Sequence, residues 1–301
     1  MKLYYKFNIL IFLLAIITSC ANRNNNNTMS NTHRIMTCNI RITALPQDSL
    51  PGRLWADRRD VIVKVIRDKN PDILCFQEVI YDSYNYLRNK FSDYATFGFE
   101  GPEMDSYTNG YHYIGKNVIF YRMSRYDLIS SGTYWLSEKP LIGGSISWNS
   151  VRARHCNWIR LKDKKTGKQF RVLNIHLDHK NDTARTEQLN LVIRESAQYS
   201  PDFPQILCGD FNSGWTHNTV KNLLQAEWIE MYDTVHQHKK SGFTYHAFKG
   251  SKYQTKRLRI DFIWSHGSVN PVKAEIIRDK IDGVYPSDHY FVLSEFELGK
   301  D

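Results

Sequence analysis

Six separate segments of this sequence each join an apolar stretch to residues that can bind a metal ion or transfer a proton. These residues carry carboxylates, amides or imidazoles: Asn39, Glu78, His176, Asp178, Asp210, Asn212, Asp261, Asp288 and His289. Such groups are costly to bury unless they contact one another, an ion or a polar ligand. If the segments are strands that end at one place, they would form a polar cleft suited to metal-assisted hydrolysis.

The segment 204–213 shows this pattern most clearly. Its apolar residues 206–208 fit a strand that is buried on both faces. Gly209 permits a turn or a close approach of another backbone. Asp210 and Asn212 are two residues apart, so both side chains point to the same side of an extended chain. Taken alone, the pair also fits an ordinary turn, which Asp and Asn favour.

Five further segments repeat the arrangement of an apolar strand next to polar residues. They are 34–41, 71–79, 170–179, 258–264 and 286–289. The third alternates strictly between polar and apolar residues, which places Asn174, His176 and Asp178 on one face of a strand. One such strand carries little information, but six together indicate a shared cleft.

These segments resemble the motifs of the endonuclease/exonuclease/phosphatase superfamily, which includes DNase I, abasic-site endonucleases, bacterial sphingomyelinases, inositol polyphosphate 5-phosphatases and deadenylases. The resemblance covers residues 33–298, with the motifs in the family's order. The motifs are Thr-Cys-Asn-Ile-Arg (37–41), Gln-Glu-Val (77–79), Asn-Ile-His-Leu-Asp-His (174–179), Gly-Asp-Phe-Asn (209–212), Ile-Asp-Phe-Ile (260–263) and Ser-Asp-His (287–289). Residues 134–140 and 154–158 further resemble a bacterial lipoprotein subgroup. The resemblance implies an α/β fold: a four-layer αββα sandwich of two mixed β-sheets flanked by helices.

The resemblance also implies a metal site with oxygen ligands. Glu78 matches the family's principal metal ligand, with Asn39 assisting and Asp288 completing the inner or outer shell. A site of this kind, with no cysteine at ligand spacing, favours Mg²⁺, and Mn²⁺ is the second choice.

The remaining matched residues would perform the chemistry. His289 and Asp261 resemble the family's His–Asp pair, in which the carboxylate fixes the imidazole tautomer. Asp210 would orient or deprotonate the attacking water, and Asn212 would hold that water. His176 would donate to the phosphate or the leaving group. The sequence leaves open whether Asp210 or His289 is the base.

Three residues are candidates for substrate binding. Arg154 either contacts the substrate phosphate or pairs with an acid, and Asp178 lies close to His176 in the sequence. Arg41 stands where DNase-like enzymes can carry an acid, so a second metal ligand is not assured at that position. Each residue alone would fit a structural role, whereas the matched set favours a site.

The function that these residues favour is a Mg²⁺-dependent phosphoesterase that attacks a phosphodiester or a phosphomonoester with water. Nuclease and phosphatase activities, and the sphingomyelinase and inositol-phosphate phosphatase alternatives, all fit the motifs. A non-catalytic surface binding protein on the same scaffold would be expected to lack Glu78, Asp210 or His289. A metal-free esterase would need a Gly-x-Ser-x-Gly elbow, which the sequence lacks. Residues 98–105 and Lys116 depart from the subgroup pattern, so the specificity loop differs.

Composition and the N-terminal segment indicate where the protein acts. The formal net charge of +9 favours an anionic substrate or surface, including nucleic acid. Residues 1–20 have a basic start, a short apolar run and a lipobox-like end, so we expect a lipoprotein signal peptide with lipidation of Cys20. This predicts an exported bacterial membrane lipoprotein that faces the periplasm or the cell surface. Residues 21–32 would be a flexible Asn-rich tether, and 33–301 one monomeric domain.

Periodicity predicts the elements that position the site. Apolar residues at helical spacing predict helices over 53–68 and 182–199, and a shorter helix over 84–91. Residues 117–121 predict a strand, and 97–115 a long surface loop. Strand–helix–strand units next to hairpins predict mixed sheets covered by helices. The four cysteines after Cys20 lie in apolar strands, where they are expected to be small buried fillers.

Overall fold

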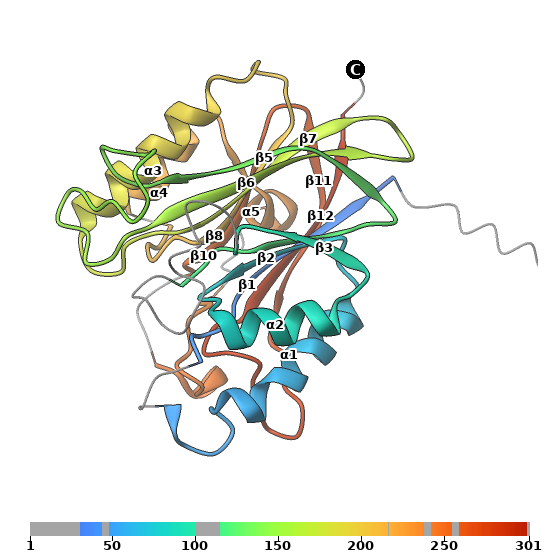
Figure 1. The fold of residues 1–301 in the computed structure, drawn as a ribbon, viewed down its shortest axis with the longest axis vertical. Coiled ribbons are helices and arrows are strands. Elements are labelled where there is room, and N and C mark those ends of the chain that lie inside the picture. The colour runs from blue at the N-terminus through green and yellow to red at the C-terminus, as the bar shows by residue number, and fades with distance from the viewer. Residues whose placement is uncertain are drawn as a thin grey trace, which may run out of the picture. The chain divides into compact units, whose positions relative to one another are not determined.

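The protein is built on two β-sheets of six strands each (Figure 1). The strand order of the first sheet is β11 (Val269–Ile277), β12 (Phe291–Leu298), β1 (His33–Asn39), β2 (Ile73–Gln77), β4 (Ile119–Arg122) and β3 (Tyr94–Phe97). The order of the second is β5 (Tyr126–Trp135), β6 (His155–Asp163), β7 (Gln169–His176), β8 (Gln205–Asp210), β10 (Asp261–His266) and β9 (Ile229–Glu230). The helices are α1 (Trp55–Lys69), α2 (Tyr81–Lys90), α3 (Asp182–Ser196), α4 (Asn218–Gln225) and α5 (Met231–His236).

This computed structural model describes residues 31–43, 48–99, 115–215, 217–237, 242–254 and 259–299. The predicted signal peptide with Cys20, most of the predicted tether and residues 100–114 lie outside this range, so lipidation and the specificity loop stay predictions. Residues from Asn31 to Asp301 form one compact unit. Among the described helices, none has both the length and the apolar character needed to cross a bilayer.

Three hydrophobic clusters hold the layers together. The first packs α1 and α2, through residues such as Val61 and Leu87, on the outer face of the β1–β2 sheet. The second lies between the two sheets. The third packs α3 and α4, through residues such as Leu189 and Leu223, on the outer face of the β7–β8 sheet. The predicted four-layer αββα sandwich is therefore confirmed (Figure 1).

Local capping explains where two of the predicted helices begin. Helix α2 begins at Tyr81, three residues before the prediction, because Ser83 Oγ accepts a hydrogen bond from the backbone N–H of Ile80 (3.0 Å). Helix α3 begins at Asp182, where the preceding Asn181 accepts from the N–H of Ala184 (2.9 Å).

The strand pairing brings the predicted site segments to one end of the sandwich. Parallel strands β1 and β2 end side by side, with Asn39 opposite Gln77. Parallel strands β7 and β8 also end together, with His176 opposite Asp210. Strand β10 is antiparallel to β8 and begins there, with Asp261 also opposite Asp210. The carboxyl ends of the parallel strands and the start of β10 therefore converge.

A polar contact joins the two sheets just below this end. Gln77 Nε2 of β2 donates to Asn174 Oδ1 of β7 (2.7 Å), and both side chains are fully buried. Asn174 Nδ2 donates in turn to the carbonyl oxygens of Phe76 and Val118 (2.9 and 3.1 Å). Because buried amides are costly to leave unpaired, this network favours one relative register of the two sheets.

The four cysteines in the described residues lie where small apolar fillers were expected. Cys38, Cys75, Cys156 and Cys208 are buried free thiols. Burial raises the pKa values of Cys38, Cys156 and Cys208, and that of Cys156 rises to about 12. These three groups are therefore protonated and unreactive at neutral pH.

Position 209 requires a glycine because another backbone packs closely against it. Its φ is +151°, and a Cβ atom at this position would collide with the carbonyl oxygen of Ile175 on β7. Gly209→Ala should lower the free energy of unfolding by about 1–3 kcal/mol and reduce activity, because Asp210 is the next residue. Gly167→Ala is the matched control, since φ is +76° and a Cβ there would have no heavy atom within 4 Å. Urea denaturation should show the larger loss for Gly209→Ala; equal losses would contradict this account.

His33 should make the fold sensitive to acid. Its Nδ1 lies 2.7 Å from Tyr126 Oη, and its ring stacks on Phe296. Burial, with the positive charge of Arg125, lowers its pKa to about 3. The unfolded chain therefore binds this proton from about pH 6.5 downward while the folded chain does not, so stability falls as the pH falls from 6.5 toward 3. The expected loss is about 1 kcal/mol at pH 5.5, and thermal unfolding of His33→Gln should show a smaller loss between pH 7 and 5.5.

Candidate active site

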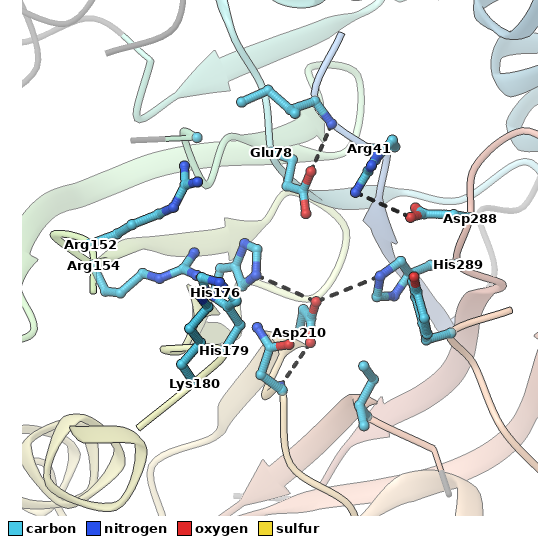
Figure 2. A pocket seen from close by; sticks show the side chains of 15 residues that line it. Arg41, Glu78, Arg152, Arg154, His176, His179, Lys180, Asp210, Asp288 and His289 are labelled. Carbon is cyan, nitrogen blue, oxygen red and sulfur yellow. Dashed lines mark hydrogen bonds and ion pairs between the residues drawn. The ribbon is translucent and has the colours of Figure 1, made fainter. Parts of the chain in front are cut away.

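A pocket of about 510 Å³ opens at the end of the sandwich where the strands converge (Figure 2). Its lining is mostly charged and polar: Arg41, Ile42, Glu78, Gly115, Arg152, Arg154, His176, His179, Lys180, Asp210, Asn212, Tyr245, Ile260, Asp288 and His289. Eight of the eleven residues predicted for the site within the described range belong to this lining. Asn39, Asp178 and Asp261 lie behind it and contact residues near it, as described below.

Asp210 is the centre of the site. Its Oδ2 accepts a hydrogen bond from Asn39 Nδ2 (3.0 Å) and lies 3.4 Å from His176 Nε2 and 3.9 Å from His289 Nε2. Its Oδ1 accepts from the backbone N–H of Asn212 (2.8 Å). Burial and the neighbouring charge of Asp261 raise the pKa of Asp210 to about 7, against the opposing charge of His289. This carboxyl group can therefore exchange a proton near neutral pH.

His289 forms the predicted pair with Asp261. Its Nδ1 donates to Asp261 Oδ2 (2.9 Å), which leaves Nε2 facing Asp210. Thr244 Oγ1 accepts from the N–H groups of Ile260 and Asp261 (3.1 and 3.2 Å), which fixes the start of β10. Burial opposes protonation of the imidazole, but the carboxylate of Asp261 outweighs it and raises the pKa of His289 to about 10. His289 is a cation at neutral pH.

His176 is a neutral imidazole on the other side of Asp210. Burial, with the charge of Arg154, lowers its pKa well below the usual value. Its Nδ1 is buried and has no hydrogen-bond partner, while Nε2 faces Asp210. Asp210 thus lies between the charged imidazole of His289 and the neutral imidazole of His176. The two imidazoles differ in charge and therefore in their strength as proton donors.

Glu78 follows β2 and lies on the wall of the pocket above Asp210 (Figure 2). Its Oε1 accepts from Asn39 Nδ2 (3.1 Å) and its Oε2 from the backbone N–H of Ile42 (2.7 Å). Burial raises its pKa, but the N–H of Ile42 and the charges of His289 and Arg41 hold it below the usual range. The carboxylate is therefore ionised, as a metal ligand must be.

Asn39 is an amide donor in this arrangement. Its Oδ1 accepts from the backbone N–H of Arg41 (3.0 Å), so Nδ2 is the end that faces both Glu78 and Asp210. A contact from Asn39 to a metal ion would use Oδ1 and would require the amide to turn over.

Arg41 and Asp288 form the wall beside His289. Arg41 binds Asp48 through Nε and Nη2 (2.8 and 3.3 Å), and its Nη1 lies 3.4 Å from Asp288 Oδ2. Burial works against the charge of Arg41, but Asp48, Asp288 and Glu78 together raise its pKa. Arg58 of α1 supports this wall, since its Nη1 donates to the carbonyl oxygens of Ile40 and Pro286 (2.8 and 2.9 Å).

Three residues of the lining have a left-handed backbone. Arg41, Glu78 and Asn212 have φ of 59°, 64° and 50°. This conformation is unfavourable for residues other than glycine and is kept where the surroundings demand it. It turns the chain directly after β1, β2 and β8, so that the side chains enter the pocket.

The donor atoms of the pocket suit a hard divalent cation. Glu78, Asp210 and Asp288 supply carboxylate oxygens to one cavity, and none of the lining residues is a cysteine. Asp210, Asp261 and His289 also offer ligand atoms within 4.8 Å of one another. In that trio, however, His289 Nδ1 and Asp261 Oδ2 already bind each other. Glu78, whose ionised carboxylate lines the cavity, is the other candidate ligand.

Asp178 does not line the pocket. Its Oδ1 accepts from the N–H groups of Lys180 and Asn181 (2.8 and 2.7 Å). Its Oδ2 accepts from Ser150 Oγ and from the N–H of Val151 (2.9 and 2.8 Å). These bonds lower the pKa of this fully buried carboxyl group against the effect of burial. Its position favours a role in joining two loops over the substrate contact that the sequence predicted.

The sequence did not single out Arg152, Lys180 or Tyr245 as site residues. Arg152 is two residues before Arg154, and Lys180 is two residues after Asp178, so their spacing from predicted residues was an available signal. Tyr245 had no such signal, because it reaches the pocket through a loop that bridges to His289, against which its ring packs edge-on.

A buried carboxylate between two imidazoles, next to an ionised glutamate and several cations, defines a hydrolytic site for an anionic ester. Comparison with known proteins agrees. The sequence matches the endonuclease/exonuclease/phosphatase family over residues 36–289, and the chain belongs to this family. Its members are phosphoric ester hydrolases, nucleases and phosphatases among them, and are generally dependent on a divalent metal.

The chain resembles individual members with different names. Nocturnin of Drosophila melanogaster is 28% identical over 293 residues, which cover 84% of this chain and 43% of that protein. A crystal structure of an endonuclease/exonuclease/phosphatase from Bacteroides vulgatus is 30% identical, with a TM-score of 0.78 over 89% of this chain and 99% of the other. The mannosyl-6-phosphatase of Bacteroides thetaiotaomicron is 27% identical, with a TM-score of 0.76 over 88% and 100%. The chain spans about half the length of the curated relatives it matches.

Asp261→Asn should lower the pKa of His289, because the charge that stabilises the imidazolium is removed. We expect a fall of more than one unit from about 10 toward the usual value. The imidazole resonances can be followed by NMR during a pH titration. Asp202→Asn removes an exposed carboxylate outside the pocket and should leave the titration of His289 unchanged. An unshifted His289 in Asp261→Asn would contradict the pairing.

Proposed function

We propose that the protein is a Mg²⁺-dependent phosphoesterase that hydrolyses a phosphate ester of a small polar alcohol. The observation that carries this proposal is the position of Asp210 between His176 and His289 in a pocket that also holds an ionised glutamate. Mn²⁺ is the alternative ion, since the oxygen donors accept either.

Glu78 would hold the ion, with Asp288 in its inner or outer shell and Asn39 positioning Glu78. When bound, the ion would neutralise charge on the phosphoryl group of the substrate. Arg41 already lies against Asp288 and supplies a fixed positive charge to the same wall.

Asp210 is the base in this proposal. With a pKa of about 7 it is largely ionised above neutral pH, whereas His289, with a pKa of about 10, carries its proton and is not available as a base. Asp210 would take a proton from the attacking water. The N–H of Asn212 and the amide of Asn39 hold the carboxylate in place for this step.

The two imidazoles would act as donors. His289, held by Asp261, would donate from Nε2 to a phosphoryl oxygen, where its positive charge opposes the negative charge of the transition state. The neutral His176 would donate to the leaving oxygen or to a second phosphoryl oxygen. Distinct pKa values of neighbouring groups are what such a division of roles requires.

The lining favours a polar substrate of limited size. Among the described residues that line the pocket, Ile42 and Ile260 are aliphatic and Tyr245 carries a phenol ring beside the three imidazoles, so these residues offer little surface for stacking on a base. The resemblance to a mannosyl-6-phosphatase supports a sugar phosphate.

A nucleic acid is the second candidate substrate. A sequence similarity favours it. The chain is 28% identical over 134 residues to a protein of Phaeosphaeria nodorum named the CCR4-Not complex 3'-5'-exoribonuclease subunit Ccr4. The matched region covers 41% of this chain and 22% of that protein. Assays with sugar phosphates and with RNA oligonucleotides separate the two candidates.

Metal removal should abolish hydrolysis of p-nitrophenyl phosphate and bis-p-nitrophenyl phosphate. We expect loss of turnover after dialysis against EDTA and recovery on addition of Mg²⁺. His289→Ala should reduce kcat by about 10²–10⁴-fold with the metal present, and its thermal unfolding should show that it is folded. Metal-independent turnover, or full activity in His289→Ala, would exclude the proposed mechanism.

A further inference from the structure

The pocket has a second group of basic side chains that the proposed reaction does not use. Arg152, Arg154, His179 and Lys180 lie on one side of Asp210, whereas Arg41, Asp288 and His289 lie on the other (Figure 2). We call these four residues the basic wall. The separation indicates that a phosphoryl group held at Asp210 and His289 would lie apart from the basic wall.

Arg154 is the anchor of the basic wall. It directly precedes β6 and is 7% exposed, yet it makes no ion pair with a carboxylate of a described residue. Its Nε is buried without a hydrogen-bond partner. Within the described part of the chain, its side-chain hydrogen bond runs from Nη2 to His179 Nδ1 (3.4 Å), which accepts as a neutral imidazole. Burying an unpaired guanidinium is costly, so a native structure keeps one where an anion binds.

The acid with the largest electrostatic effect on this guanidinium, Asp178, makes no ion pair with it. Both oxygens of Asp178 are occupied by the four hydrogen bonds from residues 150–151 and 180–181. Gln188 completes the arrangement, since its Oε1 accepts from the N–H of Asp178 (2.9 Å) and its Nε2 donates to Ser150 Oγ (3.0 Å). The hydrogen-bonding capacity of Asp178 is therefore used to join the loop before Arg152 to the loop that carries Lys180, and its charge acts on Arg154 only without direct contact.

This arrangement fixes the basic wall before any ligand arrives. Because Asp178 ties the two loops by their backbone, the positions from which the side chains of both loops extend hold one spacing without a bound anion. Such preorganised cations bind an anion with less loss of conformational freedom than mobile surface lysines do. The burial of Arg154 strengthens the attraction further, since water screens it less.

We propose that the basic wall binds a second anionic group of the substrate, so that the preferred substrate is a small phosphate ester that also carries a phosphate or a carboxylate. This proposal rests on the proposed function for the position of the reacting phosphate. Arg154 and Arg152 would bind the second anion, and Lys180 would contribute at the rim.

Kinetics with matched substrates test the preference. Glucose 6-phosphate carries one anionic group, whereas glucose 1,6-bisphosphate and 6-phosphogluconate add a phosphate and a carboxylate. With Mg²⁺ present, we expect kcat/KM at least tenfold higher for one of the two doubly anionic probes, and the one that is preferred identifies the second group. Arg154→Gln should reduce this ratio to near one, and Lys180→Gln should reduce it about threefold.

The control is Lys162→Gln, which removes an exposed positive charge from the same strand, β6, away from the pocket. It should keep the native ratio. A ratio near one in the native protein, or an unchanged ratio in both Arg154→Gln and Lys180→Gln, would overturn the proposal. So would an RNA oligonucleotide that is hydrolysed with higher kcat/KM than either doubly anionic probe.

Binding of inorganic phosphate to the metal-free protein separates this proposal from the proposed function. Without the ion, the carboxylates near Glu78 repel an anion and the basic wall remains. ³¹P NMR should show binding that Arg154→Gln weakens about tenfold and Lys162→Gln leaves unchanged. This result supports the basic wall even if no probe is hydrolysed, in which case the proposed function fails alone. Absence of phosphate binding to the native protein, or equal binding by Arg154→Gln, would overturn the basic wall itself.

Discussion

The site depends on the two sheets keeping one fixed position relative to each other. Asn39 belongs to the first sheet and Asp210 to the second, and the hydrogen bond between them crosses the interface (3.0 Å). The buried pair Gln77 and Asn174 crosses it one layer deeper. Apolar packing between sheets tolerates small slips, whereas buried amides lose their partners when a strand slides. Polar contacts therefore set the geometry that the hydrophobic clusters stabilise.

Two arginines of the pocket differ in the charges that surround them. Arg41 lies among three carboxylates, Asp48, Asp288 and Glu78, and is neutralised there. Arg154 feels the charges of Asp178, Asp210 and Glu78 but makes no ion pair with a carboxylate of a described residue. The two ends of one cavity thus present different fields, which is how a single pocket can distinguish the reacting part of a ligand from the rest of it. Both fields weaken with ionic strength at the exposed rim and much less at the buried Arg154.

The strand ends were predictable from the sequence because they follow a local rule. An apolar run followed by Asp210, or one that begins with Asp261, indicates where a buried strand meets solvent. The confirmed αββα arrangement came from the motifs, since periodicity alone gave mixed sheets without their stacking. The basic wall was harder to predict from the sequence, because it depends on two loops that Asp178 joins through backbone groups. Sequence spacing does not show which donors fill a carboxylate, so the prediction that Asp178 is a candidate for substrate binding rests on its motif alone.

The left-handed backbone conformations of Glu78 and Asn212 serve the active site but lower the stability of the fold. A glycine at position 78 would relieve backbone strain of about 1 kcal/mol or more, but it would remove the carboxylate. Selection for heat resistance alone would therefore favour replacements that abolish catalysis. This trade-off between stability and activity is general for strained active sites. An engineering effort on this scaffold would have to add rigidity elsewhere, for example in the outer helices, and leave these corners untouched.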